Sequence, residues 1–131
     1  MKYWIIPSNS QKFDMEAALR ANGGVLDWRI KNVSEGDMVF MYKTLPAGCI
    51  KYLMEVVKTN VPSIERLNQR RFWKDIVMLN NGDGIYARLK LIENFDEKRL
   101  SIHNLRLHGI NGNIQSKRVC PKETLEYILN E

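Results

Sequence analysis

The sequence is most informative at residues 35–42, which read EGDMVFMY. The opening Glu35-Gly36-Asp37 is typical of a turn, and every residue after it in this stretch is apolar or aromatic. An unbroken apolar run of this length indicates a strand that is buried on both faces of a sheet. We therefore expect residues 38–42 to form a central strand.

A hairpin is expected to follow this strand. Pro46 and Gly48 mark a turn, and residues 50–58 are again rich in apolar and β-branched side chains. The connection is longer than the two-residue loops of the tightest hairpins. The sequence thus predicts two antiparallel strands at the centre of the fold.

Short elements are expected on both sides of the hairpin. Asp14 is a suitable helix cap, Gly23-Gly24 a left-handed stop, Ser101 a second cap with Gly109 as its stop, and Pro121 a helix start. Residues 64–79 fit helical spacing imperfectly, and residues 80–84 form a strong turn signal. The expected elements are strands at 3–7, 25–31 and 85–92, an extended segment within 113–119, and helices at 15–22, 102–108 and after Pro121.

Length and element order together predict one α+β domain over residues 1–131. About five strands and three or four short helices are expected, with strands that are neighbours in sequence paired antiparallel. A small curved or closed sheet suits such a chain. No repeat or linker divides it.

Charge and composition narrow the class of partner. The chain has 20 Lys and Arg against 15 Asp and Glu, a net charge of +5, and a pI near 9.3, which favours polyanionic partners. No apolar run approaches the roughly 18 residues of a membrane span, and no export signal is recognisable. We expect no membrane association, a cytoplasmic location, and reduced thiols at Cys49 and Cys120.

The short sequence patterns that resemble enzyme or metal sites have simpler structural interpretations. Asp96-Glu97-Lys98, with Asp83 upstream, matches half of a metal-dependent nuclease site, but such a charge run is usually a solvated turn. His103 and His108 lack the spacing of a zinc helix, and the chain has no GxSxG, GxxxxGK[ST] or GxGxxG motif. We expect neither a catalytic set, nor a metal site, nor a cofactor.

The aromatic residues point to binding instead. Trp4 lies inside the first expected strand and is best explained by core packing, whereas Trp28 and Tyr42 lie near strand ends beside polar residues. Aromatic faces hold a nucleobase by stacking, worth about 1 to 3 kcal/mol per base, while amides and backbone groups read its edge. This mixture predicts a base-binding pocket.

The order of these blocks resembles the EVE family of PUA-like domains, in the branch found free-standing or fused to restriction-type nucleases. The resemblance extends over almost the whole chain, whereas the Gly-x-Lys-x-x-Glu-x-Arg signature of the related ASCH domains is absent. The residues that carry it are 3–9, Phe13-Asp14, Asp27-Trp28, 35–42, 50–52, Phe72-Trp73, 86–91, Leu105, His108-Gly109 and Gln115.

The resemblance implies a small PUA-like barrel of five to six strands, flanked by short helices, that holds a flipped, modified base such as a methylated one. It places the base-binding pocket at Ser8, Asn9, Trp28, Tyr42, Lys43, Thr44 and Gln115. Exposed cations would contact phosphates and add a salt-dependent contribution to binding. These are Lys12, Lys43, Lys117 and Arg118.

Three functions remain in view. The leading hypothesis is a module that reads a modified base in DNA or RNA without chemistry. A second is a subunit of a nuclease or of an RNA-modification enzyme, with a nuclease as partner. A third is a binder of a nucleoside or another small molecule.

Overall fold

The computed structural model describes residues 1–74 and 84–130. Its centre is a six-stranded mixed sheet in the order β2-β5-β4-β3-β1-β6, so the order of strands does not close into a ring. The strands are β1 (Tyr3–Ser8), β2 (Val25–Arg29), β3 (Met38–Lys43), β4 (Cys49–Lys58), β5 (Tyr86–Asn94) and β6 (Arg118–Val119). Short helices flank the sheet: α1 (Met15–Ala21), α3 (Ile102–Leu107) and α4 (Lys122–Leu129).

These elements confirm the α+β class and the expected hairpin. β3 pairs antiparallel with β4, and β4 pairs antiparallel with β5. The expectation that neighbours in sequence pair antiparallel is wrong for β1 and β2, because β1 pairs in parallel with β3 and β2 pairs with β5. The connection from β1 to β3 contains both α1 and β2, and such a long crossover allows the chain to return in the same direction.

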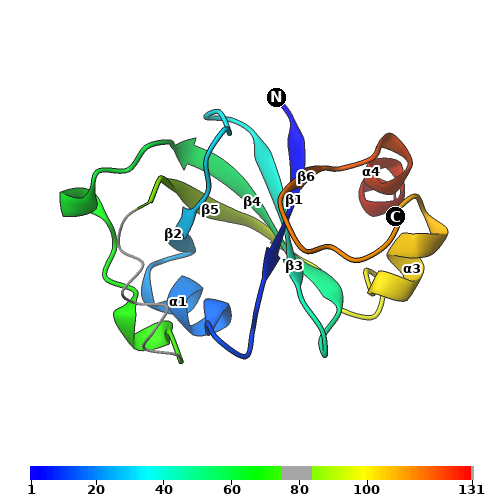
Figure 1. Cartoon of the computed structure of the whole chain (residues 1–131), viewed down its shortest axis with the longest axis horizontal. Coiled ribbons are helices and arrows are strands. Elements are labelled where there is room, and N and C mark those ends of the chain that lie inside the picture. The colour runs from blue at the N-terminus through cyan, green and yellow to red at the C-terminus, as the bar shows by residue number, and fades with distance from the viewer. Residues whose placement is uncertain (75–83, 131) are drawn as a thin grey trace.

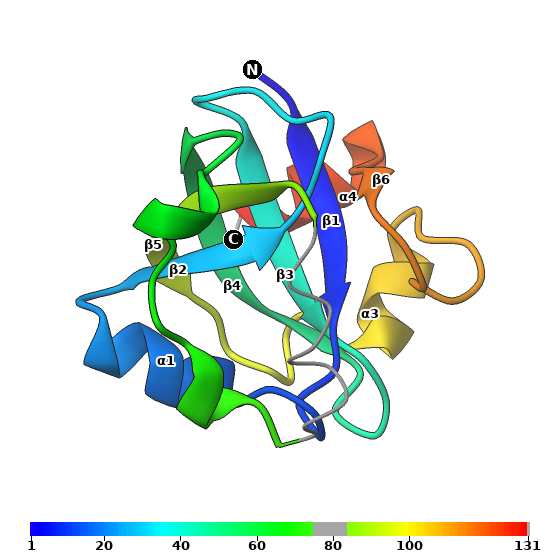
Figure 2. The same cartoon turned by 60° about the vertical axis from the view of Figure 1, so that its left-hand side comes forward.

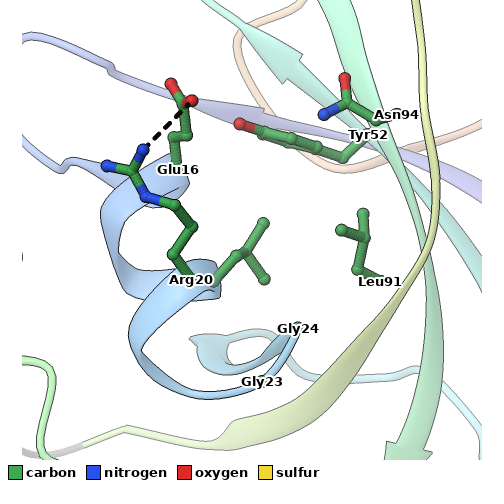
Figure 3. Close-up of a pocket in the computed structure, with 8 residues that line it drawn as sticks. Glu16, Arg20, Gly23, Gly24, Tyr52, Leu91 and Asn94 are labelled. Carbon is green, nitrogen blue, oxygen red and sulfur yellow. Dashed lines mark ion pairs between the residues drawn. The ribbon is translucent and has the colours of Figure 1, made fainter.

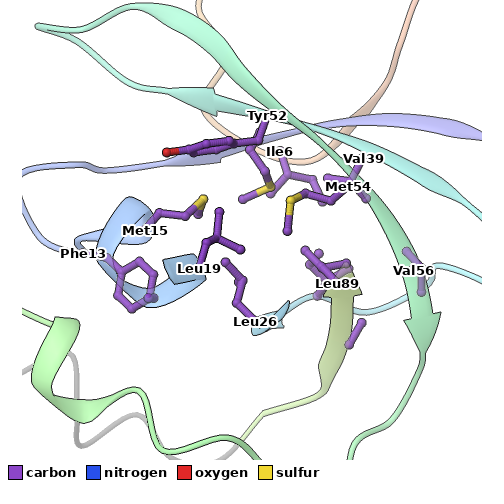
Figure 4. Close-up of a cluster of buried hydrophobic side chains, with 14 of the residues drawn as sticks. Ile6, Phe13, Met15, Leu19, Leu26, Val39, Tyr52, Met54, Val56 and Leu89 are labelled. Atoms are coloured by element: carbon purple, nitrogen blue, oxygen red, sulfur yellow. The ribbon is translucent and has the colours of Figure 1, made fainter. Parts of the chain in front are cut away.

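The sheet separates two cores, and Figures 1 and 2 show α1 on one side of it and α3 and α4 on the other. Along β3 the side chains alternate: Val39 and Met41 pack toward α1, whereas Phe40 and Tyr42 pack toward α3 and α4. The central strand is therefore buried on both faces, as its composition predicts. The first core, beside α1, includes Ile6, Met15, Leu19, Leu26, Met54 and Leu89 (Figure 4).

The caps of α1 act as the sequence predicts. Asp14 Oδ1 accepts a hydrogen bond from the Ala17 N–H at 3.1 Å. At the other end Gly23 and Gly24 adopt φ values of +65° and +84°, which favour glycine. The helix therefore ends in a turn whose backbone lacks side-chain cover.

The second core holds α3 and α4 together. The His108 ring stacks on Tyr127 with centroids 3.8 Å apart, and Thr124 Oγ1 donates to the His108 carbonyl at 2.7 Å. His108 thus has a packing role, and His103 is exposed. Cys49 and Cys120 are both free and buried.

The segment after β4 differs from a single imperfect helix. It forms two short 3-10 turns, Ser63–Glu65 and Arg70–Phe72. The remainder of the expected helix and the turn at residues 80–83, with Asp83, lie outside the described residues. Within the described part of the chain, no helix is long and apolar enough to cross a membrane.

Candidate nucleic-acid interface

Four residues of the predicted site meet at the carboxyl ends of β1 and β3. The parallel register places Ser8 beside Lys43, and the Thr44 N–H donates to the Ser8 carbonyl at 2.9 Å. The Asn9 carbonyl then accepts the N–H groups that begin the next turn. The parallel pairing, which sequence analysis missed, is what brings these two loops together.

The polar groups of these loops are partly used within the fold. Asn9 Oδ1 accepts from the Gln11 N–H at 2.9 Å, which leaves its side-chain NH₂ as the available donor. Ser8 is only 6% exposed, so its hydroxyl has little contact with solvent. Asn9 is therefore the better placed of the two for reading a ligand.

Lys43 carries a charge that is partly balanced. Its ammonium lies 3.3 Å from Glu97 Oε1, and Lys51 lies 4.0 Å from the same oxygen. In the same turn Asp96 Oδ1 accepts the Lys98 N–H at 2.8 Å. The Asp96-Glu97-Lys98 run thus forms a hydrogen-bonded surface turn.

Three aromatic rings form what we call the aromatic cluster: Phe13, Trp28 and Trp73. The Phe13 centroid lies 5.2 Å from that of Trp28 and 4.6 Å from that of Trp73. The two indole rings are nearly parallel, at 13°, with centroids 6.0 Å apart. Phe13 is buried, whereas both indoles are half-buried and keep part of their surface open to solvent.

The backbone fixes Trp73 beside Phe13. These two residues form an isolated antiparallel bridge, flanked by hydrogen bonds from the Asp14 N–H to the Phe72 carbonyl at 2.8 Å and from the Lys74 N–H to the Lys12 carbonyl at 2.7 Å. A short strand-like contact therefore joins the loop before α1 to the segment after β4. Phe13 and Trp73 are about sixty positions apart in the sequence, so no local sequence pattern predicts this contact.

Asp27 ties the same segment to β2. It is 2% exposed, and its carboxylate accepts from the Leu67 N–H at 2.8 Å and from Arg88 Nε at 2.9 Å. The Gln69 amide pairs with both backbone groups of Asp27, accepting from its N–H at 2.7 Å and donating to its carbonyl at 2.8 Å. This network holds Trp73 opposite Trp28, the residue after Asp27.

The three tryptophans differ in the hydrogen bonding of their indole N–H groups. Trp4 Nε1 donates to Asp37 Oδ2 at 2.9 Å, so its polar group is used within the fold. Within residues 1–74 and 84–130, neither Trp28 nor Trp73 has a hydrogen bond to its indole nitrogen. Both indoles of the aromatic cluster therefore offer a free donor as well as a ring face.

Cations border the aromatic cluster. Lys12, Arg71 and Lys74 are exposed on the two segments that the bridge joins, and the Lys74 ammonium donates to the Ser10 carbonyl at 3.1 Å. The acidic residues of the same two segments, as far as the structure describes them, are Asp14, which caps α1, and Glu65, which pairs with Lys58. The local balance is positive, which suits a phosphate backbone.

Tyr42 lies apart from the aromatic cluster. It is 4% exposed and packs in the second core, on the opposite face of the sheet from Trp28. Burial raises the pKa of its phenol above the ordinary value. The two aromatic walls that the resemblance implies are not brought together, because alternation along β3 turns Tyr42 toward α3 and α4.

The late loop is largely engaged in the fold itself. Lys117 Nζ donates to the carbonyls of Lys31 at 2.8 Å and Asn32 at 3.2 Å, and it lies 4.2 Å from the Trp4 ring centroid. Burial lowers the pKa of this lysine. Arg118 donates to the Asn111 carbonyl at 3.3 Å, and Gln115 is exposed. Lys117 thus ties the loop before β6 to the end of β2.

Sequence reasoning missed Trp73 as a site residue. The signal was present, since Trp73 lies in the run RRFWK at 70–74, where basic residues flank two aromatic ones. The sequence around Trp73 predicts no regular strand, so Trp73 could not be placed at a strand end as Trp28 and Tyr42 were. The bridge to Phe13 supplies the position that the sequence pattern lacks.

Comparison with known proteins identifies the fold. No family model and no curated protein matches the sequence. Similar solved structures include a Pseudomonas syringae protein (18% identity, TM-score 0.63, 98% of this chain and 97% of that chain), ASCH from Zymomonas mobilis (15%, 0.63, 98% and 94%) and a hypothetical Leishmania major protein (17%, 0.62, 99% and 93%). At these identities the likeness shows the fold alone: this chain has the fold of the Zymomonas ASCH structure, and the likeness assigns it to no family.

Proposed function

We propose that this protein is a nucleic-acid-binding module that holds one unpaired base against Trp28 and Trp73. The observation that carries the proposal is the aromatic cluster, in which two nearly parallel, half-exposed indoles keep free N–H donors. Stacking on an aromatic side chain contributes about 1 to 3 kcal/mol per base and tolerates any sequence. The indole donors add hydrogen bonds to base or sugar acceptors.

The phosphate backbone would run over the bordering cations. Lys12, Arg71 and Lys74 lie on segments adjoining the rings, and the net charge of +5 draws a polyanion toward the whole molecule. Such contacts position the strand without reading its sequence. Affinity should therefore fall as salt concentration rises.

The finer proposal is that the base is flipped out and modified. A methyl group would pack on the indole surface, with a transfer free energy of roughly 0.8 kcal/mol, so discrimination by the methyl alone would be modest. Asn9 would supply the amide that reads the base edge. The resemblance to EVE domains supports this assignment by analogy of fold.

On this proposal the protein binds a base without transforming it. Its partner is DNA or RNA, with a nuclease or modification enzyme acting separately. The support is that the polar groups beside the rings are amide, indole and lysine donors, which recognise acceptors and phosphates.

Fluorescence anisotropy with single-stranded RNA and DNA, each with and without a methylated cytosine or adenine, tests the proposal. Trp28→Leu should weaken binding about tenfold, since one stacking contact is lost. Trp4→Phe is the matched control, because Trp4 has its N–H on Asp37, and it should bind like the natural protein while folded. Equal affinities for the natural protein and Trp28→Leu would contradict the proposal.

A further inference from the structure

A hollow, which we call the helix pocket, lies between α1 and strands β4 and β5 (Figure 3). Its volume is about 310 Å³, at the small end of ligand-binding pockets. Its lining includes Glu16, Leu19 and Arg20 from α1 and Tyr52, Leu91 and Asn94 from the sheet. It shares no lining residue with the aromatic cluster.

Tyr52 supplies a polar group to the wall of the helix pocket. Its side chain is 2% exposed, and its hydroxyl has no hydrogen-bond partner in the part of the chain that the structure describes. Figure 3 shows the hydroxyl directed across the hollow toward the Glu16 side of α1. The hydroxyl oxygen itself is not enclosed by protein atoms, so within the hollow a ligand can donate to it or accept from it.

The state of that hydroxyl is set by its surroundings. Burial and the nearby carboxylate of Glu16 raise the pKa of Tyr52 to about 12. The phenol is therefore neutral at physiological pH and both donates and accepts. It can therefore bind either a donor or an acceptor of an uncharged ligand.

The walls of the helix pocket are apolar and its mouth is open. Leu19 and Leu91 supply the hydrophobic surface. Gly23 and Gly24 follow the end of α1, and a Cβ added at Gly24 would lie 3.7 Å from Leu91 Cβ. The absence of a side chain at Gly24 therefore leaves Leu91 accessible at the mouth of the helix pocket.

The charges at the rim balance. Glu16 and Arg20 form an i,i+4 pair at 3.9 Å, and both side chains are well exposed. Asn94 adds an amide that carries both a donor and an acceptor. A rim with no net charge and mixed polarity favours a neutral ligand that also has donors and acceptors.

We propose that the helix pocket binds a small neutral heterocycle of this kind, of which a free nucleoside is the fitting class. The ring would lie between Leu19 and Leu91, with its polar edge on the Tyr52 hydroxyl and the Asn94 amide. The proposal stands apart from the aromatic cluster, because it depends on different side chains.

Titration of the ¹⁵N-labelled protein with adenosine and with cytidine, up to about 10 mM, tests this assignment. The amide signals of Gly23, Gly24 and Leu91 should shift with at least one nucleoside. Tyr52→Phe removes the hydroxyl alone and should weaken binding about tenfold, as loss of one hydrogen bond to a buried site predicts. Tyr3→Phe, on the opposite core, is the matched control and should bind like the natural protein.

Asn94→Ala, at an exposed position, gives a second variant whose folding is not at risk, and it should also weaken binding. Absence of shifts with both nucleosides, or equal affinities for the natural protein and both pocket variants, would overturn the assignment. Oligonucleotide binding by Tyr52→Phe should be unchanged. Failure of either site is thereby distinguishable from failure of the other.

Discussion

Trp4 and the Trp28–Trp73 pair are the same residue type in two opposite situations. At the Trp4 corner the indole N–H is bound by Asp37, which also accepts the backbone N–H groups of Lys2 and Ser34, each at 3.0 Å. In the aromatic cluster, both indole N–H groups lack partners among the described residues. A tryptophan whose polar group is already used stabilises the fold, whereas one with a free donor can bind a ligand.

At the Trp4 corner, hydrogen bonds outweigh the effect of burial on the pKa of Asp37. Burial alone raises the pKa of Asp37, but hydrogen bonds from Trp4, Ser34 and Lys2 outweigh it and hold that pKa below its usual value. The carboxylate is therefore ionised under ordinary conditions. Each contact at this corner joins parts of the chain into the sheet.

The largest expected effect comes from breaking the Trp4 corner. Asp37→Ala leaves three donors without an acceptor and should lower the free energy of unfolding by about 3 to 5 kcal/mol. Urea denaturation measures the change. Glu35→Ala, at an exposed neighbour, should change stability by less than about 0.5 kcal/mol. A loss below about 1 kcal/mol in Asp37→Ala would mean that the corner is not structural.

The next effect concerns the aromatic cluster. Trp73→Leu should weaken binding of a single-stranded oligonucleotide about tenfold, because one stacking face is lost. If both indoles contact one base, the double variant Trp28→Leu/Trp73→Leu should lose less than the product of the single losses. Anisotropy titrations of the natural protein and the three variants complete this double-mutant cycle. A fully multiplicative loss would indicate two independent base contacts instead.

The smallest effect distinguishes phosphate contact from base contact. Lys74→Ala should reduce the slope of log affinity against log salt by about 0.7, the value for one phosphate on a single strand. Lys122→Ala removes an equally exposed charge from the start of α4, across the sheet, and should leave the slope unchanged. Identical slopes for Lys74→Ala and the natural protein would remove this lysine from the interface.

Local signals predicted most of the fold. The cap at Asp14, the Gly23-Gly24 stop and the apolar run of β3 each depend on residues close in sequence, and the structure has all three. The parallel pairing of β1 with β3 was not predictable in this way. It depends on how the connection through α1 and β2 packs on the sheet, which is a property of the whole chain.

The candidate site was predicted only in part for the same reason. Ser8, Asn9, Lys43 and Thr44 lie at strand ends that can be read from sequence, but the unpredicted parallel pairing of β1 with β3 brings them together. Tyr42 faces the other core, because its direction depends on a two-residue alternation that an entirely apolar strand conceals. Trp73 reaches the site through a bridge to Phe13, and no local pattern encodes that partner.

The Gln69 amide bears on how the molecule behaves at high concentration. β2 ends the row of strands, and an uncovered outer strand offers its backbone to other molecules. At Asp27 these backbone groups are already hydrogen-bonded, because the Gln69 amide pairs with both the N–H and the carbonyl just as a neighbouring peptide would. One glutamine side chain thereby occupies the outward backbone groups at the middle of this edge strand, where an added strand would otherwise pair.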